Sequence, residues 1–148
     1  MNARPLLAIA LLCASIAAQA AGSCFNVAGD IVRQSGNRLD RQELTEVLQA
    51  LGRSGRLPPK FVTKKQARAA GWRPGDSLWS VPALQGKSIG GDRFGNYEKQ
   101  LPKGQWQEAD LGYKGGKRGA YRIVFSRDGQ RYVTVDHYQR FVEVPPCR

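Results

Sequence analysis

The stretch Tyr121-Arg-Ile-Val-Phe-Ser-Arg-Asp-Gly-Gln-Arg-Tyr-Val-Thr-Val135 decides the fold of this chain. Its two arms, residues 121–125 and 132–135, are rich in β-branched and aromatic side chains, which are typical of strands. The Asp128-Gly129 pair between them is a strong signal for a tight hairpin turn. The sequence therefore predicts two antiparallel strands that meet at this turn.

Two further strands are expected around the hairpin. Residues 106–111 precede it, separated by a glycine-rich loop over 113–119, and residues 141–144 follow it. Upstream, residues 71–104 are rich in Gly, Pro and Trp and offer only short strand-like pieces. Within them, residues 87–92 are predicted to form a glycine turn.

The first half of the chain predicts two helices. Asp40 is expected to cap the first, with Glu43 completing a capping box. Apolar side chains then recur at helical spacing as Leu44, Val47, Leu48 and Leu51, and Gly52 is expected to end the helix. The second helix is predicted to begin at Thr63, with a capping box to Gln66, and to stop at Gly71.

The N-terminus has the pattern of a secretory signal peptide over residues 1–20. Arg4 supplies the positive charge, Leu6–Ala18 is almost wholly apolar, and Ala18-Gln19-Ala20 is a cleavage signal. A membrane anchor is the alternative, but the apolar run is shorter than the ~20 residues of a spanning helix. We expect a protein secreted to the periplasm or the medium, with cleavage near Ala20.

After cleavage, residues 21–38 show no clear periodicity and are interpreted as an N-terminal arm. Residues 39–148 are expected to form a single domain. Cys13 lies in the predicted signal peptide, so Cys24 and Cys147 remain, and an even pair in an oxidising compartment predicts one disulfide. The chain has no Cys-x-x-Cys motif or Cys/His cluster, so no metal site is expected.

The charge predicts a polyanionic partner. The formal net charge is +11, or +10 without Arg4, and such a basic exported protein attracts polyanions. Solubility or adhesion to cell surfaces explains the same charge equally well. Lys64 and Lys65 stand in the first turn of the second helix, where the helix dipole disfavours cations. An anion docked at this helix end, or two solvated lysines, would account for them.

Counting residues along the strands brings three charged groups onto one face of the sheet. A two-residue hairpin turn places Arg122 opposite Val135, with His137 as its diagonal neighbour. Folding the preceding loop near Gly115 places Glu108 opposite Arg122. A slip of one residue in that longer loop would turn Glu108 to the other face.

A carboxylate, an arginine and an imidazole in a row suit the cleavage of RNA. Glu108 can take the proton from a ribose 2′-OH, and the sole histidine, His137, can protonate the departing 5′-oxygen. Arg122 can stabilise the charge that builds on the phosphoryl oxygens. Each of these groups taken alone is also compatible with a surface salt bridge.

Several motifs occur in an order that resembles the barnase family of guanyl-preferring, secreted microbial ribonucleases. The similarity runs from about Asp40 to Val144. The motifs that carry it are Leu57-Pro58, Phe61-Val62-Thr63-Lys64, Gly71-Trp72, Gly86-Lys87-Ser88-Ile89-Gly90-Gly91-Asp92, Trp106-Gln107-Glu108-Ala109-Asp110 and Asp136-His137-Tyr138-Gln139 followed by Phe141.

The resemblance implies an α+β fold, in which N-terminal helices pack on one face of a twisted antiparallel β-sheet. It implies cleavage of single-stranded RNA after guanosine, through a 2′,3′-cyclic phosphate to a 3′-phosphate, without a metal or cofactor. Glu108 would be the general base and His137 the general acid. Three cations would bind the scissile phosphate, namely Lys64, Arg118 and Arg122, and Asp92 would organise them.

The resemblance also places the base-binding loop at Phe94-Gly95-Asn96-Tyr97-Glu98. Backbone N–H groups and the Glu98 carboxylate would read the guanine edge, and Tyr138 would stack on a base. The family usually has serine where Gly95 stands and arginine where Tyr97 stands, which leaves the strictness of guanine preference open. The N-terminal arm and the Cys24–Cys147 pair are additions to the family pattern.

Two other functions fit the same sequence. The basic face could hold RNA without cutting it, as a binding module. It could also dock an acidic inhibitor protein resembling barstar, which is compatible with catalysis. We expect the mature protein to be a monomer without membrane association, and the sequence leaves open whether its target is nutrient RNA or the RNA of a competitor.

Overall fold

The computed structural model describes residues 2–10 and 21–148 of the chain. Residues 2–10 are exposed and form no helix or strand, and the rest of the predicted signal peptide, with Cys13 and the cleavage signal, lies outside the described residues. In the described part of the chain, no helix has the length and apolar character needed to cross a membrane.

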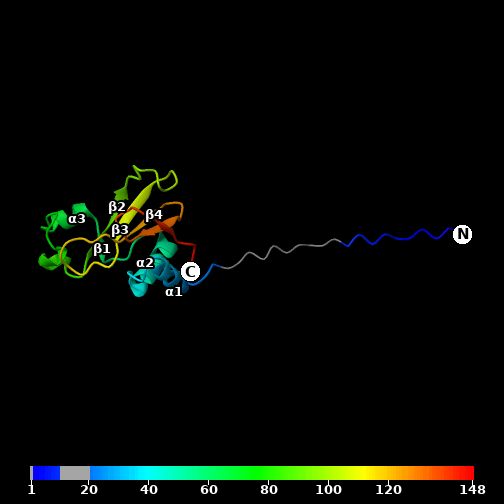
Figure 1. Ribbon diagram of the computed structural model, residues 1–148, viewed down its shortest axis with the longest axis horizontal. Coiled ribbons are helices and arrows are strands. Elements are labelled where there is room, and N and C mark those ends of the chain that lie inside the picture. The colour runs from blue at the N-terminus through cyan, green and yellow to red at the C-terminus, as the bar shows by residue number, and fades with distance from the viewer. Residues whose placement is uncertain (1, 11–20) are drawn as a thin grey trace.

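Within the described residues, six strands form one sheet in the order in which they follow along the chain (Figure 1). The pairing of β1 with β2 is parallel and every later pairing is antiparallel. The strands are β1 (Phe61–Val62), β2 (Ser88–Phe94), β3 (Trp106–Asp110), β4 (Arg122–Ser126), β5 (Arg131–Thr134) and β6 (Val142–Glu143).

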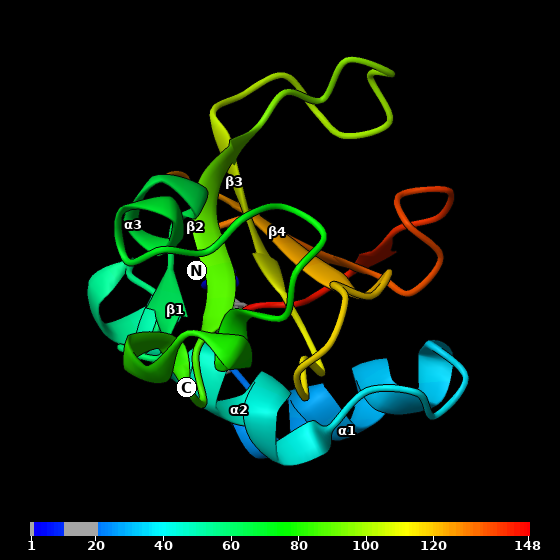
Figure 2. The same cartoon turned by 90° about the vertical axis from the view of Figure 1, so that its left-hand side faces the viewer.

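Three α-helices and two short 3₁₀-helices accompany the sheet. They are α1 (Cys24–Gln34), α2 (Arg41–Ser54), α3 (Lys64–Ala69), η1 (Leu78–Ser80) and η2 (Pro82–Leu84). Figure 2 shows α1 and α2 side by side at the bottom of the view, and the loop between β2 and β3 extending away from them at the top. This arrangement confirms the predicted α+β class.

The main core lies between the helix pair and one face of the sheet. Leu44, Val47, Leu48 and Leu51 of α2 are buried, as their spacing predicted, against strand residues such as Ile123. Burying each large aliphatic side chain stabilises the fold by ~1.5–3 kcal/mol. The opposite face of the strands carries the charged side chains of the candidate site.

Residues 21–38, which the sequence analysis interprets as an N-terminal arm, contain the helix α1, which was not predicted. Ser23 caps α1 by accepting a hydrogen bond from the backbone N–H of Asn26. Cys24, Val27, Ala28 and Ile31 form a buried stripe with i, i+3, i+4, i+7 spacing. An isolated helix of this length is marginal in water, so its packing against α2 stabilises it.

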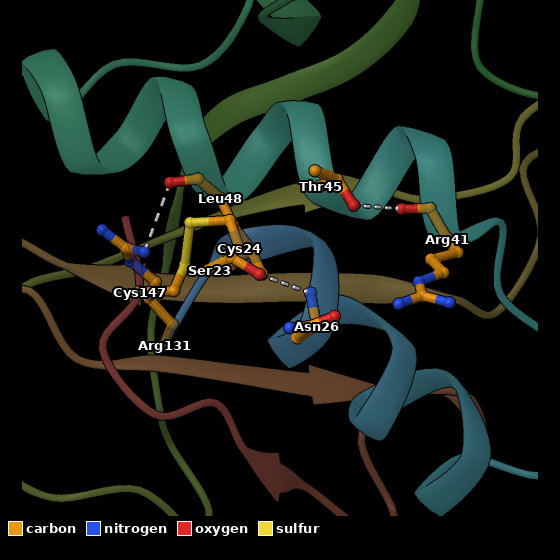
Figure 3. Close-up of a disulfide and its surroundings, with 8 residues drawn as sticks. All are labelled: Ser23, Cys24, Asn26, Arg41, Thr45, Leu48, Arg131 and Cys147. Atoms are coloured by element: carbon orange, nitrogen blue, oxygen red, sulfur yellow. Dashed lines mark hydrogen bonds between the residues drawn. A yellow bond between two sulfur atoms is a disulfide. The ribbon is translucent and has the colours of Figure 1, made fainter. Parts of the chain in front are cut away.

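The predicted disulfide joins α1 to the end of the chain. Cys24 and Cys147 are bonded across 123 residues, and Figure 3 shows the bridge beside α2. The backbone N–H of Cys24 also donates to the carbonyl of Arg148, and the N–H of Arg148 donates to the carbonyl of Gly22. The two ends of the domain are therefore held together by covalent and backbone bonds.

Helix α2 begins as predicted but ends later. Asp40 accepts a hydrogen bond from the Glu43 N–H, whereas the Glu43 carboxylate binds Lys60 and the N–H of Gly112 instead of closing a capping box. The helix continues through Gly52 to Ser54, and the left-handed residue that ends it is Gly55, at φ 68°. A second glycine three residues downstream thus provides the C-terminal cap.

The predicted glycine turn at residues 87–92 is wrong, because residues 88–92 belong to strand β2. The register shifts between Gly90 and Asp92, and Gly91 has φ +99°, so the glycines form a β-bulge within the strand. A Cβ at Gly90 would lie 2.6 Å from Cδ1 of Phe61. Glycine is therefore required there for close packing of β1 on β2.

The register of the central strands differs from the prediction. Arg122 pairs with Thr134 and not with Val135, because Ser126 donates to the carbonyl of Gln130 across a three-residue loop. On the other side, Arg122 pairs with Asp110 and not with Glu108. Since side chains alternate with a period of two, a shift of two residues leaves Glu108 on the predicted face.

Candidate active site

Glu108 lies in the middle of β3, half-buried, and is held by a tyrosine from another part of the chain. The hydroxyl of Tyr138 donates a 2.6 Å hydrogen bond to Oε2 of Glu108. Burial of the phenol, together with this hydrogen bond and the charge of Glu108, raises the pKa of Tyr138 to about 12. Tyr138 therefore keeps its proton, and its hydrogen bond to Glu108, across the neutral range.

Asp110, two residues further along β3, organises two arginines. It is buried and accepts 2.7 Å hydrogen bonds from both Nε and Nη2 of Arg118. Nε of Arg122 lies 2.9 Å from Oδ1 of Asp110, but its N–H is not aligned with that oxygen, so the contact is a charge pair without a hydrogen bond. The bond to Asp110 is the main cause that raises the pKa of Arg118.

Arg122 is fixed by its own strand as well as by Asp110. Its Nη1 donates to the carbonyls of Gly119 and Tyr121 at 2.8 Å, and the residue is buried. Its guanidinium is therefore rigid and largely desolvated. Such a preorganised cation stabilises developing negative charge better than one in free solvent.

The predicted diagonal pairing of His137 with Arg122 is wrong, because β5 ends at Thr134 and the chain then turns. His137 and Tyr138 adopt left-handed φ values of 55° and 70°. The His137 N–H donates to the carbonyl of Ala120, and its exposed ring lies 4.9 Å from that of Tyr138. Successive strained residues of this kind cost on the order of 1–3 kcal/mol each and concentrate at functional sites.

A polar network stabilises this turn. Thr134 accepts a hydrogen bond from the Tyr138 N–H and donates one to Asp136. Asp136 also accepts the backbone N–H of Arg140, which is the main cause that lowers the pKa of its carboxyl. Hydrogen bonds therefore connect the turn from Thr134 in β5 to Arg140, and they hold Tyr138 and its neighbour His137 in position.

Asp92 contacts one of the three cations that it was expected to organise. Its carboxylate accepts the backbone N–H of Lys64 at 3.0 Å and thereby binds the start of α3. The carboxylate that joins Arg118 and Arg122 is Asp110, because Asp110 stands opposite Arg122 whereas Asp92 stands opposite Glu108. Asp110 belongs to the Trp106–Asp110 motif, and its spacing of two from Glu108 could have indicated a shared face.

Lys64 and Arg118 meet at one side of the site. Both line a cavity of about 360 Å³, together with Arg68, Lys117 and Trp72. The lining also includes the carboxylate of Asp76, but four cationic side chains against one carboxylate favour an anionic group. The structure thus brings the three predicted phosphate-binding cations to two adjoining places, Lys64 with Arg118 here and Arg118 with Arg122 at Asp110.

The predicted base-binding loop forms a second cavity on the other side of Glu108. This cavity of about 340 Å³ is lined by all five loop residues, Phe94, Gly95, Asn96, Tyr97 and Glu98, and by Glu108 and Tyr138. Asn96, at φ 51°, closes the loop by exchanging hydrogen bonds with the backbone of Leu101. The rings of Phe94 and Tyr138 stack at 5.2 Å, which gives the cavity an aromatic wall.

The carboxylate of Glu98 stands at the exposed side of this loop. It accepts a 3.0 Å hydrogen bond from Nε2 of Gln100, which also donates to the carbonyl of Tyr138. Gln100 therefore ties the loop to the turn that carries His137. A ligand that bound Glu98 would have to displace or share this amide.

Gly95 and Tyr97 are coupled by their geometry. Tyr97 is 87% exposed, yet its ring lies so close to Gly95 that an added Cβ would be 2.3 Å from ring atom Cε2. A side chain at position 95 would therefore displace the ring. The two positions at which this loop departs from the family pattern depend on one another.

The expectation that this chain has no metal site stays a prediction. Across residues 2–10 and 21–148, no group of three or more His, Cys, Asp or Glu side chains is placed to hold a metal ion. The two cavities and the arginine pair between them offer cations and carboxylates, and the turn that carries Tyr138 adds the imidazole of His137. Such a set can bind a phosphodiester and move protons to and from its oxygens.

Comparison with known proteins gives the family. A family model described as ribonuclease matches residues 45–145. A ribonuclease of Heyndrickxia coagulans is 45% identical over 92 residues, which cover 60% of this chain and 84% of the relative. Ribonucleases of Bacillus intermedius and Bacillus pumilus show the same identity over 92 residues, and in each the match spans 56% of the relative's length.

Proposed function

This chain belongs to the ribonuclease family and is an RNA-cleaving enzyme, and on that premise we propose that it cuts single-stranded RNA after guanosine without a metal ion. The observation that carries the proposal is the position of Glu108. It lies between the base-binding loop and the Asp110 arginine pair, on the same face of the sheet. A base bound in the loop would therefore place its 3′-phosphate near the arginines.

Cleavage follows from proton transfer between two side chains. Oε2 of Glu108 is engaged by Tyr138, so Oε1 can accept the proton of the ribose 2′-OH. The 2′-oxygen then forms a bond to phosphorus, and the bond from phosphorus to the 5′-oxygen breaks. His137 donates its proton to that leaving oxygen, and the product is a 2′,3′-cyclic phosphate.

The second step reverses the proton roles. Neutral His137 takes a proton from water, the hydroxyl attacks phosphorus, and protonated Glu108 returns its proton to the departing 2′-oxygen. The product is a 3′-phosphate. Lys64, Arg118 and Arg122 stabilise the charge on the phosphoryl oxygens in both steps, and Asp110 keeps the two arginines oriented.

Guanine selection rests on the loop that contains Glu98. The carboxylate can accept both N–H groups on the guanine edge once Gln100 yields its place. Adenine lacks this pair of donors and would leave the carboxylate unpaired, which is costly in a binding site. The stacked rings of Phe94 and Tyr138 offer an aromatic surface to the base.

The cellular setting belongs to the same proposal. The signal-peptide pattern of residues 1–20 and the Cys24–Cys147 disulfide support export to an oxidising compartment. We propose that the mature enzyme acts as a monomer. The cationic cluster around Lys64 and Arg118 would also fit an acidic inhibitor protein of the barstar type.

The test is an RNA oligonucleotide with a single guanosine, incubated with the mature protein in excess EDTA. We expect one cut on the 3′ side of the guanosine, with a cyclic phosphate that later becomes a 3′-phosphate. The His137→Ala protein, purified in parallel, controls for contaminating nucleases. Retention of RNA without a cut would favour the binding-module alternative, and cleavage that requires a divalent metal would overturn the mechanism.

A further inference from the structure

A further cavity lies on the face of the sheet opposite Glu108. It encloses about 540 Å³, within the ~300–1,000 Å³ typical of ligand sites, and its lining includes Gly55, Arg93, Gln107, Phe125 and Arg127. Gln107 pairs across the strands with both Arg93 and Phe125, and Phe125 belongs to the helix-facing core. The cavity therefore opens where the end of α2 stops covering β2, β3 and the β4–β5 turn.

The charges around this cavity favour an anion. Arg93 and Arg127 are exposed, and no Asp or Glu is among the lining residues. Across residues 2–10 and 21–148, the ion pairs involve neither of these arginines. The side-chain amides of Gln105 and Gln107 add neutral donors and acceptors beside the two guanidinium groups. Guanidinium groups bind phosphate through paired N–H donors.

Arg93 connects this cavity with the candidate active site. It lines both the cavity with Arg127 and the one formed by the base-binding loop. Arg118 is bound by Asp110, two residues beyond Glu108 along β3, whereas Phe94 of the base-binding loop pairs with Trp106 at the other end of that strand. The cationic cavity of Lys64 and Arg118 therefore lies on the other side of Glu108 from the loop. Along the surface the order is thus the Lys64 cavity, Glu108, the base-binding loop, Arg93 and then Arg127.

This order assigns a direction to a bound RNA strand. In the proposed reaction the scissile phosphate is on the 3′ side of the base held in the loop. The Lys64 cavity then faces the 3′ part of the strand, and Arg93 and Arg127 face the part that precedes the base. We propose that the Arg93–Arg127 cavity is a binding site for the nucleotides 5′ to the recognised base, with Arg127 contacting a backbone phosphate.

The inference rests on the proposed function for its strand direction, and binding can test it without cleavage. Two fluorescent oligoribonucleotides are needed, each with 2′-deoxyguanosine at the cleavage position so that no 2′-OH can attack. One carries only 3′ nucleotides, and the other carries the same 3′ nucleotides and a short 5′ extension. Their dissociation constants are measured by anisotropy with the parent and the Arg127→Gln protein at several salt concentrations.

We expect the parent to bind the 5′-extended oligonucleotide more tightly than the other one. Arg127→Gln should weaken binding of the extended oligonucleotide by roughly two- to fivefold, the size of one exposed charge contact. For the extended oligonucleotide, the slope of the logarithm of the binding constant against the logarithm of the salt concentration should be smaller in magnitude by about 0.7 in Arg127→Gln than in the parent. This is the value for one phosphate contact on a single strand. Binding of the oligonucleotide that lacks the extension should not change.

The matched control is Arg38→Gln, which removes an exposed arginine from the α1–α2 connection. The proposal would be overturned if the parent and Arg127→Gln bound the extended oligonucleotide equally well. It would also be overturned if Arg127→Gln weakened binding of both oligonucleotides to the same degree, or if Arg38→Gln weakened binding as much as Arg127→Gln does. Competition by inorganic phosphate alone, without any effect of the extension, would also overturn it and indicate a general anion site. The parent could fail to cut a matched all-ribose strand while Arg127→Gln still weakened binding of the extended oligonucleotide. That result would refute the proposed function but support the proposed binding site.

Discussion

The phenolic oxygen of Tyr138 lies 2.6 Å from Oε2 of Glu108 and donates a hydrogen bond to it. This bond joins the strained turn after β5 to the middle of β3, although the two residues are 30 positions apart. The same tyrosine ring contacts His137 and stacks on Phe94. One side chain thus links the proposed base, the proposed acid and the base-binding loop.

Titration of the tyrosines should show one group that ionises at about pH 12, well above the ordinary value of 10.0. Burial disfavours the phenolate of Tyr138, and the hydrogen bond and charge of Glu108 raise its pKa further. Glu108→Gln should lower this pKa, because the carboxylate charge is lost while the opposing influence of Arg122 persists. Phenolate absorbance against pH measures the highest tyrosine pKa in the parent and in Glu108→Gln. An unchanged value in Glu108→Gln would contradict the assignment of this pKa to Tyr138.

This tyrosine also makes the stability depend on pH. A folded-state pKa above the unfolded one gives a contribution that is fully present below pH 10 and is lost as the pH rises towards about 12. We therefore expect the parent to lose more unfolding free energy than Tyr138→Phe between these two pH values. Urea unfolding at both pH values measures the difference.

Glu108→Gln and His137→Ala should each reduce kcat/KM for RNA by about 10²- to 10⁴-fold, the usual contribution of one general acid or base. Both side chains are at least partly exposed, so the fold should persist. Circular dichroism and urea unfolding verify the fold. Near-parental cleavage by either variant would exclude the proposed proton transfers.

Asp110→Asn should lower the unfolding free energy by about 3–5 kcal/mol, because it leaves the buried Arg122 without its counter-charge. Asp30→Asn is the matched control, since Asp30 pairs with Arg33 on the exposed surface of α1. The control should have a much smaller effect. Similar midpoints in urea for Asp110→Asn and the parent would mean that the arginine pair is not held by this carboxylate.

The double variant Cys24→Ala/Cys147→Ala should be less stable than the oxidised parent. Closing a loop of 123 residues contributes about 5 kcal/mol in the chain-entropy treatment. Intact mass with and without reductant first establishes whether exported material is oxidised. Two free thiols in that material would refute the disulfide, and equal stability would refute its contribution.

The base-binding loop should respond to its two coupled positions together. Gly95→Ser alone should raise KM, because the new side chain displaces the Tyr97 ring. Tyr97→Arg should lower KM, since it adds a cation near the substrate, and change base choice little, since Glu98 is retained. The double variant Gly95→Ser/Tyr97→Arg should have a KM well below that of Gly95→Ser alone, because it has no tyrosine ring for the serine to displace.

Four oligonucleotides that differ only in the base 5′ to the scissile phosphate measure this preference. We expect the guanosine substrate to be cut fastest by the parent and by each of these variants. Equal rates on all four with the parent would show that the loop does not read guanine. Independent, additive effects of the two substitutions would show that Gly95 and Tyr97 are not coupled.

The sequence by itself determined the features that depend on neighbouring residues. The hairpin around Asp128-Gly129, the apolar face of α2 and the capping box of Thr63 with Gln66 are confirmed, because each arises from a local period or turn. The family motifs likewise indicated the α+β class. Glu108 reached the predicted face because an error of two residues in register preserves the side-chain direction.

The tertiary structure decided what depends on contacts between distant segments. A one-residue change in loop length moved Thr134 opposite Arg122, and His137 joins the site through a left-handed turn that no strand periodicity describes. Asp110 became the partner of the arginines because of its position across from β4. Helix α1 was not predicted, because so short a helix depends for its stability on contacts with α2 and on the disulfide, and these contacts exist only in the folded chain.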